Sequence, residues 1–247
     1  MGVILIAGGA TGIGLAATRA FRARGDSVLL ADKNFAAALE VAAEPLPGRA
    51  TAFDADVRVG DAVRASLTAC VAAYGTLDTV FVNAGVLISM PLERWTPEDW
   101  DLSLAVNLRA PFFFSQAAAP HLKQSPNASI IFTSSTGAIR GHAGMPAYHA
   151  SKAGLIGLVR SLADELSPFG VRVNCICPGW IDTPFNQPFW SFQEDRDAAT
   201  SELIKKIPLR RQGTPDDVTG LILFLASRES RYITGTSVVI DGGYTAI

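Results

Sequence analysis

The sequence predicts an α/β fold, a mostly parallel seven-stranded sheet with helices on both faces. Short apolar runs rich in β-branched residues alternate with longer stretches of helical periodicity along all 247 residues. Strands joined by helical crossovers pair in parallel and connect with a right-handed sense. No repeat, low-complexity tract or linker interrupts the alternation, so residues 1–247 are expected to form one domain.

The expected elements follow one another in chain order. The apolar run "VILIA" predicts the first strand, and "LAATRAFRARG" predicts the first helix. Pro146 suits the first turn of a helix that continues through "ASKAGLIGLVRSLADEL". Strands are predicted at residues 3–7, 27–32, 50–54, 78–82, 128–134, 171–176 and 236–240. Helices are predicted at residues 13–24, 34–43, 59–74, 97–123, 146–166 and 215–227.

Three glycines, at positions 8, 12 and 14, lie between the first strand and the first helix. Such a turn brings backbone N–H groups and the positive end of a helix dipole up to a pyrophosphate. Gly8 allows the tight turn, Gly12 leaves space for the phosphate, and Gly14 lets helix and strand pack closely. The pattern predicts a doubly wound, Rossmann-type sheet with a dinucleotide bound beyond the carboxyl ends of its strands.

A second pattern, in "SSTGAIRGHAGMPAYHASK", joins a serine, a tyrosine and a lysine. Tyr148 and Lys152 are four residues apart and share one face of a helix, and Ser135 precedes Tyr148 by thirteen residues. A lysine ammonium group held close to a phenol favours the phenolate, so Lys152 is expected to lower the pKa of Tyr148. Ser134 and Thr136 are neighbouring hydroxyls that compete with Ser135 for a place opposite the phenol.

Together these patterns resemble the short-chain dehydrogenase/reductase family, in its compact single-domain branch. The family's Thr-Gly-x-x-x-Gly-x-Gly motif is matched from Ala7 to Gly14, with alanine in place of threonine. Its Asn-Asn-Ala-Gly segment is matched from Val82 to Gly85, with valine at the first position. "CPGWIDT" and "ITGTSVVIDGGY" are similar to the family's Pro-Gly segment and final strand. The resemblance extends over residues 2–247.

The resemblance implies a role for each residue that matches a family motif. The implied catalytic residues are Asn107, Ser135, Tyr148 and Lys152, with Asn107 positioning a proton-relaying water behind Lys152. The implied cofactor-binding residues are Gly8, Gly12, Ile13, Gly14, Asp32, Asp56, Val57, Asn83, Ala84, Gly85, Tyr148, Lys152, Pro178, Gly179, Ile181 and Thr183. No residues are expected to bind a metal.

The end of the second strand, "SVLLADKN", bears on the identity of the cofactor. Asp32 lies where an acidic side chain meets the adenosine ribose 2′-hydroxyl and repels a 2′-phosphate. Lys33 softens this repulsion, but residues 9–14 contain no arginine or lysine. The sequence therefore favours NAD over NADP, with a plain turn residue as the alternative role of Asp32. For the adenine contact, Asp56 is favoured over Asp54, because a strand ending at Asp54 leaves Asp56 in the loop.

The expected reaction is a hydride transfer that interconverts a secondary alcohol and a ketone, with Tyr148 as the general acid/base. One alternative is an NADP-dependent carbonyl reductase of the same fold. An alternative from another class is a catalytically silent, dinucleotide-sensing regulatory protein, although such proteins commonly lack the tyrosine or the lysine. Enoyl reductases of related fold space these two residues further apart than the chain does.

The substrate side carries weaker signals. Residues 184–206 form the least regular stretch, and the resemblance implies a mobile lid over the substrate, with an oligomer interface as the alternative. His149 lies about 100° around the helix from Tyr148 and is expected to face elsewhere. Trp180 and Met145 are candidates to line the substrate pocket. Arg140 and His142 are candidates to contact an acidic group of the substrate, with solvated loop charges as the alternative.

Composition argues against several other classes of protein. Apolar residues make up 49% of the chain and the formal net charge is −2, so no nucleic-acid-binding surface is expected. No apolar run reaches the roughly 18 residues of a membrane span, and no signal-like segment is evident. The cysteines at 70, 175 and 177 form no metal pattern and are expected to be buried fillers. A cytoplasmic homotetramer acting on a small-molecule alcohol or ketone is expected, the tetramer on the family resemblance.

Overall fold

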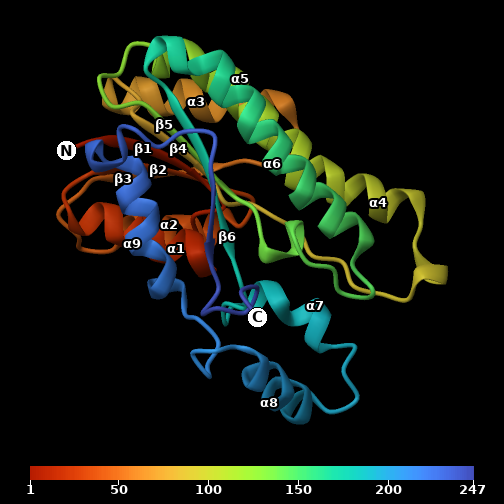
Figure 1. The fold of residues 1–247 in the computed structure, drawn as a ribbon. Coiled ribbons are helices and arrows are strands. Elements are labelled where there is room, and N and C mark those ends of the chain that lie inside the picture. The colour runs from red at the N-terminus through yellow and green to blue at the C-terminus, as the bar shows by residue number, and fades with distance from the viewer.

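The computed structural model describes residues 1–247 and contains one seven-stranded sheet with helices on both faces (Figure 1). The strand order is β3-β2-β1-β4-β5-β6-β7, and every neighbouring pair is parallel. The predicted fold class is therefore confirmed. The strands are β1 Val3–Ala7, β2 Ser27–Asp32, β3 Ala50–Asp54, β4 Thr79–Val82, β5 Ser129–Thr133, β6 Arg172–Pro178 and β7 Ser237–Ile240.

The helices connect these strands as crossovers. They are α1 Gly12–Ala23, α2 Phe35–Ala43, α3 Gly60–Tyr74, α4 Pro97–Leu104, α5 Ala110–Leu122, α6 Pro146–Leu166, α7 Gln187–Trp190, α8 Arg196–Lys206 and α9 Pro215–Ala226. Single 3₁₀ turns occur at Leu92–Arg94, Thr136–Ala138, Ser167–Phe169, Pro184–Asn186 and Arg228–Ser230. The chain runs outward from β1 to β3 and then returns to β4 beside β1. This reversal is the switch point at which α/β sheets bind ligands.

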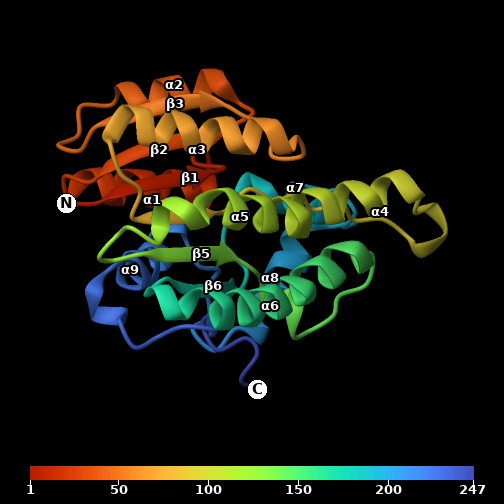
Figure 2. The ribbon, with the colours of Figure 1, turned by 90° about the horizontal axis from the view of Figure 1, so that it is seen from above.

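The two faces of the sheet carry separate apolar layers. On β1, Val3, Leu5 and Ala7 pack in the layer of α3, α5 and α6, whereas Ile4 and Ile6 pack in the layer of α1, α2 and α9. Figure 2 shows α3, α5 and α6 side by side across one face. Both faces of β1 are buried, which explains why its sequence is a continuous apolar run rather than an alternating one. Burial of each valine, leucine or isoleucine side chain among these contributes about 1.5–3 kcal/mol.

The stretch predicted as one helix over residues 97–123 contains a change of helical geometry. Between α4 and α5, residues Ala105–Arg109 form a π-helical segment. Asn107 lies in this segment, and its side chain donates to the Val86 carbonyl and accepts from the Val86 N–H, both at 2.9 Å. Single π turns of this kind often occur at functional sites. The extra residue follows from contacts with a distant loop, so local periodicity does not predict it.

The stretch from residue 184 to residue 206 is more regular than the sequence predicts. It contains a 3₁₀ turn and the helices α7 and α8, which lie beyond the end of β6 (Figure 1). Both helices pack on a small third apolar cluster made of Trp190, Leu203, Ile207 and Tyr244. Because only a few side chains are needed to cover so small a cluster, the helical period in the sequence is weak.

Candidate active site

One cavity of 410 Å³ opens beyond the carboxyl ends of the strands and brings most of the predicted site residues together. Its volume lies in the range of ligand pockets. Gly14 and Asn107 lie outside its lining. The predicted residues that line it are Gly8, Gly12, Ile13, Asp32, Asp56, Val57, Asn83, Ala84, Gly85, Ser135, Tyr148, Lys152, Pro178, Gly179, Ile181 and Thr183.

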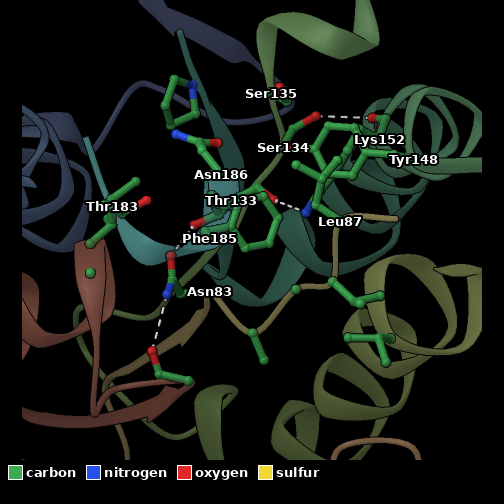
Figure 3. Close-up of a pocket in the computed structure, with 18 of the residues that line it drawn as sticks. Asn83, Leu87, Thr133, Ser134, Ser135, Tyr148, Lys152, Thr183, Phe185 and Asn186 are labelled. Carbon is green, nitrogen blue, oxygen red and sulfur yellow. Dashed lines mark hydrogen bonds between the residues drawn. The ribbon is translucent and has the colours of Figure 1, made fainter. Parts of the chain in front are cut away.

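The glycine turn after β1 is closely packed. Gly8 has a φ of +76°, and a Cβ added there would lie 2.8 Å from the backbone of Ala84. A Cβ added at Gly14 would lie 1.8 Å from the Gly8 carbonyl oxygen. Gly14 therefore allows the helix and the strand to pack closely, and it does not line the cavity. The Asn83 side chain donates to that same oxygen at 3.0 Å and accepts from the Thr133 hydroxyl at 3.0 Å (Figure 3). These contacts fix the turn against the ends of β4 and β5.

The N-terminus of α1 has the features of an anion site. Its N-cap residue, Thr11, makes no side-chain capping bond, and the first turn contains no acidic residue. Thr11, Gly12 and Ile13 all line the cavity. Uncapped N–H groups and the positive end of the helix dipole therefore face the space that a pyrophosphate would fill. The glycine cradle and this helix end fit a dinucleotide.

Asp32 lies at the far end of the cavity from Tyr148's helix, where its carboxylate is held by the backbone. One oxygen accepts from the Ala10 N–H at 3.0 Å and the other from the Asn34 N–H at 2.9 Å. A carboxylate accepts about four hydrogen bonds, so both oxygens keep capacity for a ribose hydroxyl. Lys33 lines the cavity next to it.

Asp56 has a partner that the sequence reasoning missed. Arg58 Nε donates to both oxygens of the Asp56 carboxylate, at 3.0 Å from Oδ1 and 2.8 Å from Oδ2. This hydrogen bonding holds the pKa of Asp56 below its usual value. Arg58 also lines the cavity, whereas Asp54 is exposed and does not. In "DVR" the two partners are two residues apart, which is the sequence signal that could have revealed this pair. The contact of Asp56 with adenine stays a prediction.

Tyr148, Lys152 and Ser135 converge at the other end of the cavity. Tyr148 and Lys152 come from the first two turns of α6, and Ser135 follows β5. The Lys152 ammonium group lies 5.7 Å from the centre of the Tyr148 ring and donates to the Thr133 carbonyl at 2.7 Å. The Ser134 hydroxyl donates to the Lys152 backbone carbonyl at 2.9 Å, which ties α6 to β5 (Figure 3). Ser134 is thus occupied structurally.

Burial controls the proton affinities of this group. It raises the pKa of Tyr148 to about 12, while the Ser135 hydroxyl acts in the opposite direction. Burial also lowers the pKa of Lys152 to about 8. Both shifts follow from the cost of holding a charged form out of water. The sequence predicted that Lys152 would lower the pKa of Tyr148. In the structure the loss of hydration is the largest effect on that pKa, and the Lys152 ammonium group donates to the Thr133 carbonyl instead.

The segment after β6 forms the wall facing Tyr148. The turn from Pro178 to Asn186 is fixed by the Asn186 side chain, which donates to the Ile181 carbonyl at 2.6 Å. Phe185 extends from this turn into the pocket beside Thr133 and Lys152 (Figure 3). Its ring centre lies 6.0 Å from that of Tyr148. A Cβ added at Gly85 would lie 3.4 Å from Phe185 Cε2, so the ring fills the space that Gly85 leaves open.

Arg140, in the loop before α6, and His149, in the first turn of α6, differ in how they relate to the cavity. Arg140 does not line the cavity, because it donates to the Tyr244 carbonyl at 3.0 Å and lies over the Tyr244 ring. His149, expected to face elsewhere, does line it. Its Nε2 accepts from the His142 N–H at 3.0 Å, so Nδ1 carries the proton and donates to the Gly137 carbonyl at 2.7 Å. These two bonds turn the ring toward the cavity. His142, Trp180 and Met145 also line it.

Comparison with known proteins identifies the family. A family model described as enoyl-(acyl carrier protein) reductase matches residues 8–245. A 3-oxoacyl-(acyl-carrier-protein) reductase of Thermotoga maritima is 38% identical over 243 residues, which cover 98% of this chain and 96% of that protein. The chain belongs to the short-chain dehydrogenase/reductase family.

Other members of the short-chain dehydrogenase/reductase family match with similar coverage. A probable galactose dehydrogenase of Rhizobium meliloti is 38% identical, with 97% of this chain and 93% of that protein covered. The crystal structure of levodione reductase has a TM-score of 0.89 and 31% identity, with 98% of this chain and 97% of that chain covered. The chain is thus related to oxidoreductases with varied substrates, in a family that uses nicotinamide dinucleotides.

The two departures from the family motifs leave the site intact. Alanine replaces threonine at position 7, and the Ala7 carbonyl accepts from the N–H groups of Asn83 and Ala84 at 3.0 and 2.8 Å. These backbone bonds do not depend on the side chain at position 7. Val82, in place of asparagine, is buried in the layer beneath α3 and α5. None of the helices combines the length and the apolar composition that a membrane-spanning segment requires.

Proposed function

We propose that the protein interconverts a secondary alcohol and a ketone using NAD(H), with Tyr148 as the general acid/base. The observation that carries this proposal is the convergence of Ser135, Tyr148 and Lys152 at one end of a cavity whose other end holds Asp32. The glycine turn and the uncapped end of α1 lie along the same cavity. Because the catalytic residues and the cofactor-binding residues line the same cavity, we also propose that residues 1–247 form one domain.

The chemistry follows from what each side chain offers. The bound dinucleotide supplies or accepts the hydride. In reduction, the Tyr148 phenol donates a proton to the ketone oxygen, and in oxidation the phenolate takes the alcohol proton. Ser135 Oγ accepts from the Gly137 N–H at 2.9 Å, which leaves its own proton to donate to the substrate oxygen. Lys152 stabilises the negative charge that forms on Tyr148 and binds the ribose of the cofactor.

Asn107 acts as a positioning residue in this proposal. It lies outside the cavity lining, and its amide group bonds Val86 and, at 3.2 Å, the Ser151 hydroxyl. A Cβ added at Gly85 would lie 3.3 Å from Asn107 Oδ1 and 3.7 Å from Lys152 Nζ. Asn107 thus fixes the loop that packs against the lysine, and a proton-relaying water behind Lys152 remains part of the proposal.

One observation favours a second candidate, an NADP-dependent carbonyl reductase. Lys33 and Arg58 line the same end of the cavity as Asp32, and either cation would attract a 2′-phosphate. We favour NAD because Asp32 faces the ribose position and Arg58 is engaged by Asp56. The three residues between Tyr148 and Lys152 support ketone rather than enoyl reduction.

A panel of secondary alcohols and ketones tests the proposal, with turnover followed by the absorbance of NADH and NADPH. The expected result is turnover of at least one pair, with kcat/KM higher for NADH than for NADPH. A higher value for NADPH favours the second candidate. Binding of NADH with no turnover across the panel favours a regulatory protein instead.

The remaining proposals concern assembly and location. We propose a homotetramer, on the family resemblance, and light scattering should give about four times the 26.1 kDa chain mass. The three cysteines are free and buried, which agrees with a reducing compartment such as the cytoplasm. The cavity fits a small molecule, and no nucleic acid or membrane is part of the proposal.

A further inference from the structure

His142 lies in the loop between Ser135 and α6 and lines the cavity next to His149, whose ring centre is 5.8 Å from that of Tyr148. Its ring is packed among three aromatic side chains. It stacks on His149 with ring centres 5.9 Å apart and on Tyr244 at 6.1 Å, and it meets the edge of Trp180 at 5.5 Å. A loop side chain held on three sides is pre-organised for binding.

The hydrogen bonds of His142 leave one ring nitrogen without a partner. Nε2 pairs with the Tyr244 hydroxyl at 3.3 Å, and Nδ1 has no hydrogen-bond partner in the protein. If Tyr244 donates to Nε2, Nδ1 carries a proton and is a donor; in the other tautomer it is an acceptor. His149 differs, because both of its ring nitrogens are engaged. His142 therefore contributes a polar atom that the protein itself does not use.

The surroundings favour an uncharged partner for His142. Burial lowers the pKa of the His142 imidazole, and His149, Arg140 and Lys206 lower it further, so the ring is neutral near pH 7. Arg140 is turned toward Tyr244, and neither Arg140 nor Lys206 lines the cavity, so no cation on this wall would attract an acid. The rest of the wall near Tyr148 is largely apolar, with Leu87, Met145, Trp180 and Phe185.

We propose that His142 determines substrate specificity by hydrogen-bonding a second, uncharged oxygen of the substrate, such as a hydroxyl or a carbonyl. The inference rests on the proposed function, since the first oxygen is the one bound by Tyr148 and Ser135. The enzyme then selects a ketone that carries a second oxygen over a ketone of similar size whose only oxygen is the reacting carbonyl. Tyr244 is a positioning residue, because it acts on the substrate only through His142.

Two pairs of ketones of matched size test this selection. One pair is 4-hydroxycyclohexanone and cyclohexanone, and the other is ethyl 3-oxobutanoate and 2-heptanone, which place the second oxygen at different distances. The measured quantity is the ratio of kcat/KM for the oxygen-bearing ketone to kcat/KM for its partner. Because a net hydrogen bond corresponds to a factor of about three to ten, the ratio should exceed about three in at least one pair.

Four variants separate hydrogen bonding from packing. His142→Phe keeps an aromatic ring between Trp180 and Tyr244 but has no hydrogen-bonding atom, and should lower the ratio about three- to tenfold. Tyr244→Phe should lower it to a smaller extent. His142→Gln keeps a polar group and should give a higher ratio than His142→Phe. His121→Phe makes the same substitution on α5, outside the cavity, and should leave the ratio unchanged.

The results distinguish this inference from the proposed function. A ratio near one in both pairs for the unmodified protein overturns the inference. So does a ratio that stays the same in His142→Phe, because equal losses on both ketones indicate packing alone. In either case the turnover itself leaves the proposed function standing. Reduction of none of the four ketones, while another ketone of the wider panel is reduced, overturns the inference and leaves the proposed function standing; absence of turnover across the whole panel overturns both.

Discussion

Tyr148 and Lys152 lie one helical turn apart on α6, and burial changes the proton affinity of each. The pKa of Tyr148 is about 12, so its phenol keeps its proton across the ordinary pH range and is ready to donate it to a ketone. The pKa of Lys152 is lowered to about 8, so its ammonium charge is lost as the pH rises through that value. The two shifts predict the shape of a pH profile.

Ketone reduction should be constant from pH 6 to about 7 and should decline above pH 8. The reason is that the tyrosinate formed by proton donation loses its cationic neighbour once Lys152 is neutral. The measurement is kcat/KM for reduction at saturating NADH, in buffers of constant ionic strength. A profile that stays flat to pH 10 contradicts the role given to the lysine charge. Lys152→Arg keeps its charge over this range, so any residual activity should lack the decline.

Asp32 is the residue on which the choice of cofactor depends. Asp32→Ala removes a charged hydrogen-bond acceptor worth about 1.5–3 kcal/mol, so kcat/KM with NAD should fall at least about tenfold. With Asp32→Arg, the use of NADP should rise as well. Asp54→Ala removes the same charge from the neighbouring strand end, outside the cavity, and should change neither value. An unmodified protein that prefers NADP, or a ratio unaffected by the substitutions, shows that Asp32 is only a turn residue.

At the residue scale, the sequence predicted the glycines of the turn after the first strand. It did not predict side-chain orientations that depend on contacts with loops. Gly8 and Gly14 could be assigned because their close contacts leave no room for a Cβ. The orientation of His149 could not, because it depends on bonds to the Gly137 carbonyl and the His142 N–H. Such partners are set by the path of the loop rather than by helical period.

At the scale of elements, the strands were predicted to within two residues at each end, because most of them are short runs rich in apolar residues with sharp limits. The π-helical segment Ala105–Arg109 was not predicted, since it depends on the bonds between Asn107 and Val86. α7 and α8 were not predicted either. They cover a cluster of only four buried side chains, one of which, Tyr244, comes from the end of the chain.

The turn Pro184–Asn186 carries a prediction of its own. Phe185 lies against Gly85 and near Lys152, in the space where the cofactor-binding residues meet the catalytic ones. Dinucleotide binding should therefore displace this ring. Phe185→Ala should increase the association rate of NADH at least about threefold, and it should raise the KM for the substrate, because the ring also closes the pocket.

Stopped-flow fluorescence measures this association rate directly. Phe192→Ala is the matched control, because it removes an exposed phenylalanine from the same segment without touching the cavity. Unchanged NADH association and substrate KM in Phe185→Ala would contradict a gating role. The implied lid over residues 184–206 would then lack support at the position nearest to the site.

For the whole molecule, the alternation of strands and helices determines where chemistry takes place. Parallel pairing throughout directs the carboxyl ends of all seven strands to one edge of the sheet. Motifs far apart in the sequence, from the glycine turn to residues 178–186, therefore line a single cavity. The predicted topology placed the glycine turn at this edge, and the family resemblance implied that the other motifs meet it there. It did not predict the substrate, because His142 and Phe185 acquire their positions only in the folded chain.

Tyr148→Phe tests the central claim most directly, through turnover and NADH binding measured on the same preparation. General acid/base catalysis contributes about 10²–10⁴-fold, so turnover should fall at least about a hundredfold. NADH affinity, followed by fluorescence titration, should change less than about threefold, because the glycine turn, Asp32 and Lys152 are retained. Tyr232→Phe, at a fully exposed tyrosine, should behave like the unmodified protein. Substantial turnover by Tyr148→Phe would contradict the account.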